Sequence, residues 1–145
     1  MIPAIVQLCS DATTAGGARL TRGLTGRDAD IAISPSSPGR PPRADLLIMA
    51  VTVSGQHADP EIVRLLRGAD LAGTTAFIAA FGAWPSEVQT VDRDVRPLLL
   101  QAGARCLAPV LHIVEDTATA PLDRFCRFWS PVVPSLLAGH VGVAS

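Results

Sequence analysis

Residues 45–66, DLLIMAVTVSGQHADPEIVRLL, decide the fold of this chain. Their first part, residues 45–51, is almost entirely apolar and predicts a strand that is buried on both faces. A loop over residues 52–59 follows. Residues 60–67 predict a helix, because Asp59 is a good N-cap, Pro60 suits the first helical position and the apolar residues recur at helical spacing. A buried strand followed by a loop and a helix is typical of a parallel α/β sheet.

The same alternation extends in both directions. Apolar runs at residues 2–8, 29–33, 75–81 and 105–113 predict four further strands, and residues 18–24, 86–102 and 121–137 predict helices. Pro97 predicts a kink or break in the second of these helices, and Pro131 and Pro134 predict an interruption of the third. Five strands that alternate with helices and right-handed crossovers predict a doubly wound, three-layer α/β sandwich with a five-stranded parallel sheet.

The length of 145 residues predicts a single domain over residues 1–145. The proline-rich stretch at residues 34–43 predicts an extended crossover loop, because the residues before it are too few for a second stable domain. A formal net charge of −1 argues against a general nucleic-acid-binding protein, which needs clustered positive charge. The mean hydropathy of +0.35 is high, but no apolar run approaches the roughly 20 residues of a bilayer span, so we expect no membrane association.

The composition also bears on source and compartment. All basic residues are Arg, and the chain lacks Lys, Asn and Tyr, whose codons are rich in A and T, so we infer a bacterium of high GC content. Three widely spaced cysteines (Cys9, Cys106 and Cys126) and an N-terminus without a basic segment favour a cytoplasmic protein without disulfides. No Cys/His spacing predicts a metal site. The high hydropathy favours a homo-oligomer that covers part of the apolar surface.

Three stretches carry a resemblance to a known family: residues 45–66, residues 71–85 (LAGTTAFIAAFGAWP) and residues 98–113 (LLLQAGARCLAPVLHI). In this order, and with the helix start Pro60-Glu61-Ile62-Val63, the chain resembles the flavodoxin-like family over nearly its whole length. The resemblance implies the strand order 2-1-3-4-5. It also implies that FMN binds beyond the carboxyl ends of the strands, with a function in electron transfer or as a small flavin reductase or oxidoreductase.

The resemblance implies a flavin site made of three loops. Hydroxyl and backbone N–H groups of the first loop would hold the phosphate at a helix N-terminus, and the other two loops would flank the ring, with Trp84 stacked on it. The implied phosphate ligands are Ser10, Thr13 and Thr14; the implied ring contacts are Thr52, Val53, Ser54, Gly55 and Gln56 on one side and Phe81, Gly82, Ala83 and Trp84 on the other. A small-molecule substrate or a redox partner protein would complete the reaction.

Other interpretations stay open. The first loop departs from the family pattern Ser/Thr-x-Thr-Gly-x-Thr and carries Asp11, which favours a flavin-free enzyme of the same fold. His57 would then be a general acid/base oriented by Asp59, with Asp11 as a third group. A third alternative is a non-catalytic interaction subunit that uses Phe128 and Trp129.

Several of these residues also have purely structural interpretations. Ser10, Thr13 and Thr14 are also typical turn and cap residues, Asp59 is also a plain N-cap, and His112 is expected to be a hydrogen-bonded interior histidine. Residues 92–96 predict a solvated helix face.

Overall fold

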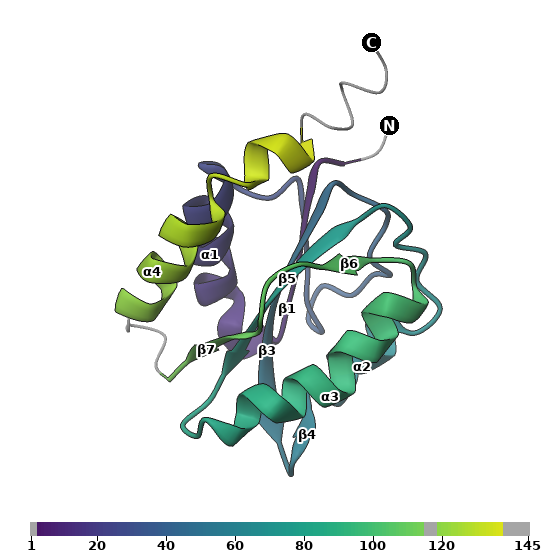
Figure 1. The fold of residues 1–145 in the computed structure, drawn as a ribbon. Helices are drawn as coiled ribbons and strands as arrows, with labels where there is room; N and C mark the ends of the chain where they lie inside the picture. Colours follow the sequence, from purple (N-terminus) through teal and green to yellow (C-terminus); the bar gives the residue numbers. More distant parts are fainter. Residues whose placement is uncertain (1–2, 115–118, 138–145) are drawn as a thin grey trace.

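A computed structural model of the chain describes residues 3–114 and 119–137. It is a three-layer α/β sandwich in which a parallel sheet lies between α1 and α4 on one face and α2 and α3 on the other (Figure 1). The strands are β1 (Ile5–Cys9), β2 (Ile31–Ile33), β3 (Leu46–Ser54), β4 (His57–Ala58), β5 (Thr75–Phe81), β6 (Arg105–Cys106) and β7 (Leu111–Ile113). The helices are α1 (Thr14–Thr25), α2 (Pro60–Leu66), α3 (Ser86–Gln101) and α4 (Ala120–Trp129), and a 3-10 turn, Asp11–Thr13, precedes α1.

The sheet has the expected doubly wound topology. Its strands lie in the order β2-β1-β3-β5-β6, and β7 also pairs with β5. These pairs are all parallel. The labels differ from the predicted 2-1-3-4-5 because β4 is a two-residue strand that pairs only with the end of β3. The predicted fifth strand, residues 105–113, is interrupted at residues 107–110 and so forms β6 and β7.

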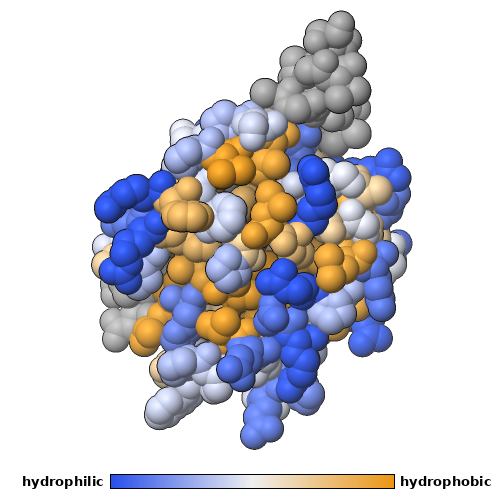
Figure 2. Space-filling model, viewed as in Figure 1, coloured by the Kyte–Doolittle hydropathy of each residue, from blue (hydrophilic) through white to orange (hydrophobic). Residues whose placement is uncertain are grey.

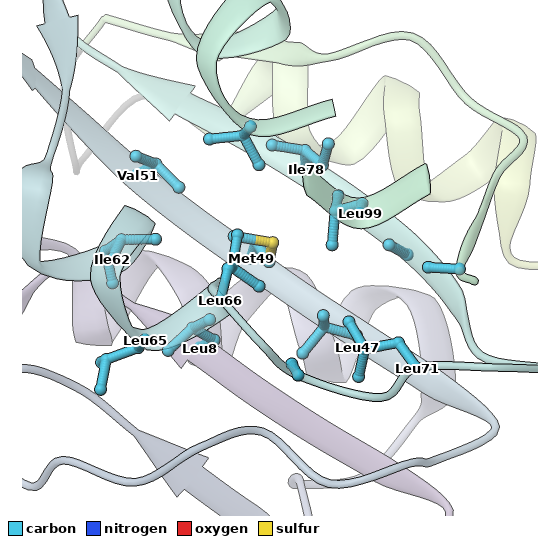
Figure 3. Close-up of a cluster of buried hydrophobic side chains, with 14 of the residues drawn as sticks. Leu8, Leu47, Met49, Val51, Ile62, Leu65, Leu66, Leu71, Ile78 and Leu99 are labelled. Carbon is cyan, nitrogen blue, oxygen red and sulfur yellow. The ribbon is translucent and has the colours of Figure 1, made fainter. Parts of the chain in front are cut away.

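The core has two halves because alternate residues of a strand face opposite sides of the sheet. Leu47, Met49 and Val51 of β3 pack with residues of α2 and α3, as Figure 3 shows. Leu46 and Ile48 belong to the second cluster, which includes residues of α1 and α4. All five of these β3 side chains are fully buried. Burial of each stabilises the fold by about 1.5–3 kcal/mol.

Two helices differ from the sequence prediction. α1 begins at Thr14, four residues before the predicted start at residue 18, and includes Gly16 and Gly17. A Cβ atom at Gly17 would lie 2.2 Å from Cys9 Sγ, so this glycine lets α1 lie against β1. Of the kink or break predicted at Pro97, the break is absent, since α3 is continuous from Ser86 to Gln101 with Pro97 in its interior. The interruption of the last helix is confirmed at Pro131, since α4 ends at Trp129 and the helix resumes at residues 133–137; Pro134 lies within that resumed stretch and does not interrupt it.

Apolar side chains gather along the sheet edge formed by β6 and β7, between α3 and α4 (Figure 2). The large exposed apolar residues around this part of the chain are Leu100, Leu107, Val114 and Phe128. The proline-rich residues 34–43 form the connection from β2 to β3, with one isolated bridge between Ser34 and Ser37. In the described ranges, no helix is long and apolar enough to cross a membrane.

Candidate functional site

Three loops meet at the carboxyl edge of the sheet. β1, β3 and β5 are neighbours, so their carboxyl ends lie side by side at the lower end of the molecule in Figure 1. The loops that follow them are residues 10–13, the turn between β3 and β4, and residues 82–85. Ligands of doubly wound proteins bind at this edge.

The first loop uses two of its hydroxyl groups to join β1 to β3. Ser10 and Thr13 are each only 2% exposed. The Ser10 hydroxyl accepts a hydrogen bond from the backbone N–H of Thr52 at 3.1 Å. The Thr13 hydroxyl donates to the backbone carbonyl oxygens of Ala50 (2.8 Å) and Ser10 (2.9 Å). Both hydroxyls therefore have structural partners, but neither caps a helix N-terminus: Thr13 Oγ1 bonds within the turn to Ser10, and the other partners lie on β3.

Asp11 and Thr14 are the exposed polar residues of the same loop. The Asp11 carboxylate accepts a hydrogen bond from the backbone N–H of Ser36 at 3.0 Å, which ties the loop to the segment after β2. Hydrogen bonds from the side chain and the backbone of Ser36 hold the pKa of Asp11 below its ordinary value. The Thr14 hydroxyl lies 3.5 Å from the carbonyl oxygen of Asp11 and stays open to solvent.

The second loop is a β-hairpin, which the sequence did not predict. β3 extends to Ser54, and β4 returns antiparallel to it with Ser54 opposite His57. Gly55 and Gln56 form the two-residue turn with φ angles of 59° and 66°. This left-handed backbone matches the twist of a tight hairpin and favours glycine at the first position.

Two side chains of α3 hold the hairpin in place. Asp94 Oδ2 accepts a hydrogen bond from the backbone N–H of Ala58 at 2.8 Å. The Arg93 guanidinium donates to the carbonyl oxygen of Gln56 at 2.8 Å and also pairs with Asp94. This ion pair is the largest cause of the lowered pKa of the Asp94 carboxyl. The prediction of a solvated face at residues 92–96 is wrong for Asp94, whose side chain is 18% exposed.

The three groups of the flavin-free alternative have separate partners. The His57 side chain is 72% exposed, and its Nδ1 lies 3.6 Å from Asp94 Oδ2. The Asp59 carboxylate accepts a hydrogen bond from the backbone N–H of Glu61 at 3.0 Å and caps α2. His57 therefore pairs with Asp94, a residue that sequence spacing alone did not connect to it.

The third loop presents an indole to solvent. Trp84 is 69% exposed, Ala83 is exposed and Phe81 is partly buried against the core. The backbone N–H of Gly82 donates to the carbonyl oxygen of Ile113, and the Gly82 carbonyl lies 3.0 Å from His112 Nε2. The expected hydrogen bond of His112 is thus confirmed.

Glu87 is a residue of this region that sequence analysis missed. Its Oε2 atom is buried without a hydrogen-bond partner among the described residues, and it occupies the place of a side chain at Gly82. A Cβ atom at Gly82 would lie only 1.2 Å from this oxygen. Gly82 was the one signal in the sequence, because a glycine after a buried strand often marks a close approach.

The structure also places Cys9, the cysteine that ends β1, and bears on metal binding in the described part of the chain. Cys9 is fully buried beneath Gly17, and burial raises the pKa of its thiol to about 11. No group of three or more His, Cys, Asp or Glu side chains among the residues that the structure describes could hold a metal ion.

Neither a protein-family model nor a curated protein sequence matches the chain. Solved structures match it closely in fold. An NADH:FMN oxidoreductase in its apo form aligns with a TM-score of 0.62 and 17% identity over 90% of this chain and 89% of that one. Oxidised flavodoxin 1 from Bacillus cereus aligns with a TM-score of 0.65 and 13% identity over 94% of this chain and 98% of that one. A Fusobacterium nucleatum flavodoxin bound to flavin mononucleotide aligns with a TM-score of 0.64 and 10% identity over 92% and 98%.

The chain therefore has a flavodoxin-like fold. Its residues suit the flavin ring of FMN better than the phosphate. The exposed indole of Trp84 and the turn of the hairpin suit a flat ring. The phosphate would depend on Thr14 and on backbone N–H groups at the start of the helix, because the Ser10 and Thr13 hydroxyls are buried and hydrogen-bonded.

Proposed function

We propose that the chain binds FMN at the carboxyl edge of the sheet and acts in redox chemistry, as an electron carrier or a small flavin-dependent reductase. The observation that carries the proposal is the exposed Trp84, which lies in the loop after β5, while the hairpin follows the neighbouring strand β3. A large indole left in solvent at the ligand-binding edge of a doubly wound sheet has the apolar face that a stacked ring needs.

Each loop would have its own task. Trp84 would stack on the flavin ring, and the backbone of Gly55 and Gln56 would offer hydrogen-bonding groups to its polar edge. Thr14 and the N–H groups that begin the helix would hold the phosphate. Bound FMN supplies the electron-accepting ring, and the protein positions it and adjusts its electronics.

The rigidity of the hairpin supports this arrangement. Arg93 and Asp94 hold Gln56 and Ala58 from α3, so the turn has a defined position before any ligand binds. A preorganised site loses less entropy when it binds a ligand.

The test is a titration of the purified protein with FMN, in which tryptophan fluorescence reports binding. Riboflavin and FAD serve as controls. The chain has two tryptophans, so Trp129→Phe leaves Trp84 as the only indole and Trp84→Phe is its matched counterpart. We expect FMN to quench the emission of the Trp129→Phe variant saturably and that of the Trp84→Phe variant much less. If the wild-type protein shows no saturable binding up to about 1 mM FMN, the free energy of binding is weaker than about −4 kcal/mol. That result would exclude the proposed function.

A further inference from the structure

A groove separates α2 from α3 on the face of the sheet where Figure 3 shows the core. Its volume is about 670 Å³, which lies in the range of small-molecule sites. The hairpin closes one end through Ser54 and His57. The residues to which the proposed function assigns FMN, which are Thr14, Gly55, Gln56 and Trp84, do not line this groove.

The floor of the groove is apolar. It consists of Pro60, Val63, Pro97 and Leu98, and Val63 and Leu98 are partly buried against the core beneath them. Val63 and Pro60 come from α2, and Pro97 and Leu98 come from α3. A ligand that covers such a surface gains about 25 cal/mol for each Å² of apolar area removed from water.

The rim of the groove is cationic. Arg64 and Arg67 line the α2 side and Arg93 lines the α3 side, whereas Asp94 is the only acidic residue of the lining. This local excess of positive charge contrasts with the net charge of −1 of the whole chain. Counting the neighbouring Glu61, which pairs with Arg64, still leaves more positive than negative groups.

The arginines retain hydrogen-bonding capacity. Arg64 uses Nε and Nη2 for Glu61, and Arg93 uses the same two atoms for Asp94 and Gln56. Arg67 is exposed, and its guanidinium has no hydrogen-bond or ion-pair partner among the described residues. A guanidinium offers five N–H donors in a planar arrangement that matches a carboxylate.

We propose that this groove is a second binding site, for a small organic carboxylate with an apolar body. The apolar body would lie on Val63 and Leu98, and the carboxylate would bind Arg67 together with the free N–H groups of Arg64. An apolar floor beside a fork of donors matches both parts of such a ligand. The site does not depend on flavin, so a failure of FMN to bind leaves this proposal intact.

The experiment uses 4-phenylbutyrate as the probe and its neutral amide, 4-phenylbutyramide, as the matched ligand. Amide NMR spectra of the ¹⁵N-labelled full chain report the position and affinity of binding. We expect shifts that concentrate at Val63, Arg64 and Leu98, and an affinity for the amide about tenfold weaker. The Arg67→Gln variant should lose about three- to tenfold in affinity for the carboxylate, whereas Arg127→Gln, the same charge change on α4, should lose none.

Three results would overturn the proposal. The first is equal affinity for the carboxylate and the amide, and the second is an equal loss from Arg67→Gln and Arg127→Gln. The third is tighter binding of a hexaglutamate peptide than of 4-phenylbutyrate at the same residues, which would assign the groove to an acidic segment of a partner protein. Both variants change exposed side chains, so their spectra should otherwise match that of the wild-type protein.

Discussion

The backbone N–H of Thr52 donates a hydrogen bond to Ser10 Oγ over 3.1 Å. This bond joins the loop that follows β1 to β3, the strand that leads into the hairpin. Residues 42 positions apart in the chain thereby share a partly buried hydrogen bond. The same serine would have been a phosphate ligand in the site that the family resemblance implies. In the structure its hydroxyl accepts this hydrogen bond at Thr52, two residues before the end of β3.

The first prediction concerns this bond. Ser10→Ala should lower the free energy of unfolding by about 1–3 kcal/mol, because the partly buried N–H of Thr52 loses its acceptor. Urea denaturation measures the loss. Thr14→Ala is the matched control, since its hydroxyl is exposed, and it should change stability by less than about 0.5 kcal/mol. Equal losses in the two variants would contradict a structural role for Ser10.

The second prediction concerns pH. The carboxyl of Asp94 has a pKa below the ordinary value of 3.8, mainly because of Arg93. Its folded pKa is lower than its unfolded one, so the stability that it contributes is complete above about pH 5 and is lost as the pH falls through the lowered pKa. In the Asp94→Asn variant, the free energy of unfolding should therefore depend less on pH below about pH 5.

Urea denaturation of both proteins at pH 6 and pH 3 gives the comparison for Asp94. The difference in unfolding free energy between wild type and Asp94→Asn should be larger at pH 6, where the wild-type carboxylate is charged in both states. The same difference at both pH values would show that the hairpin anchor does not depend on this charge.

A third prediction concerns the contact of α1 with β1. Gly17→Ala should destabilise the protein by about 1–3 kcal/mol, because the new methyl group would overlap Cys9 Sγ. Gly39→Ala is the control, since a Cβ atom there meets nothing within 4 Å. Combining Gly17→Ala with Cys9→Ala should recover part of the loss, and a double-mutant cycle measures the coupling. Strictly additive effects would mean that the two residues do not touch.

The last prediction concerns thiol chemistry. Cys9 is fully buried and its pKa is raised to about 11, so iodoacetamide at pH 8 should leave it unmodified in the native protein. Cys106 is only partly buried and should react first. Peptide mass spectrometry identifies the modified sites, and unfolding in urea should make all three cysteines reactive. Rapid native alkylation of Cys9 would contradict its burial.

Local pattern in the sequence was sufficient for most of the fold. The apolar run at residues 46–51 forms β3, and Asp59 with Pro60 begins α2 as expected. These predictions succeed because burial on both faces and helix capping depend on residues that are near one another in the chain. The position of Trp84 in the loop after β5 followed from the same local pattern.

Only the tertiary structure decided how the loops of the site are held. Ser10 contacts Thr52, and Asp94 and Arg93 hold the hairpin from residues 36 and 37 positions away. The groove with its three arginines likewise arises where α2 and α3 lie together. The sequence alone determined most of the strands and helices, but not the hairpin after β3. The structure determined their partners, because the crossovers of a parallel sheet bring together segments that no short-range pattern connects.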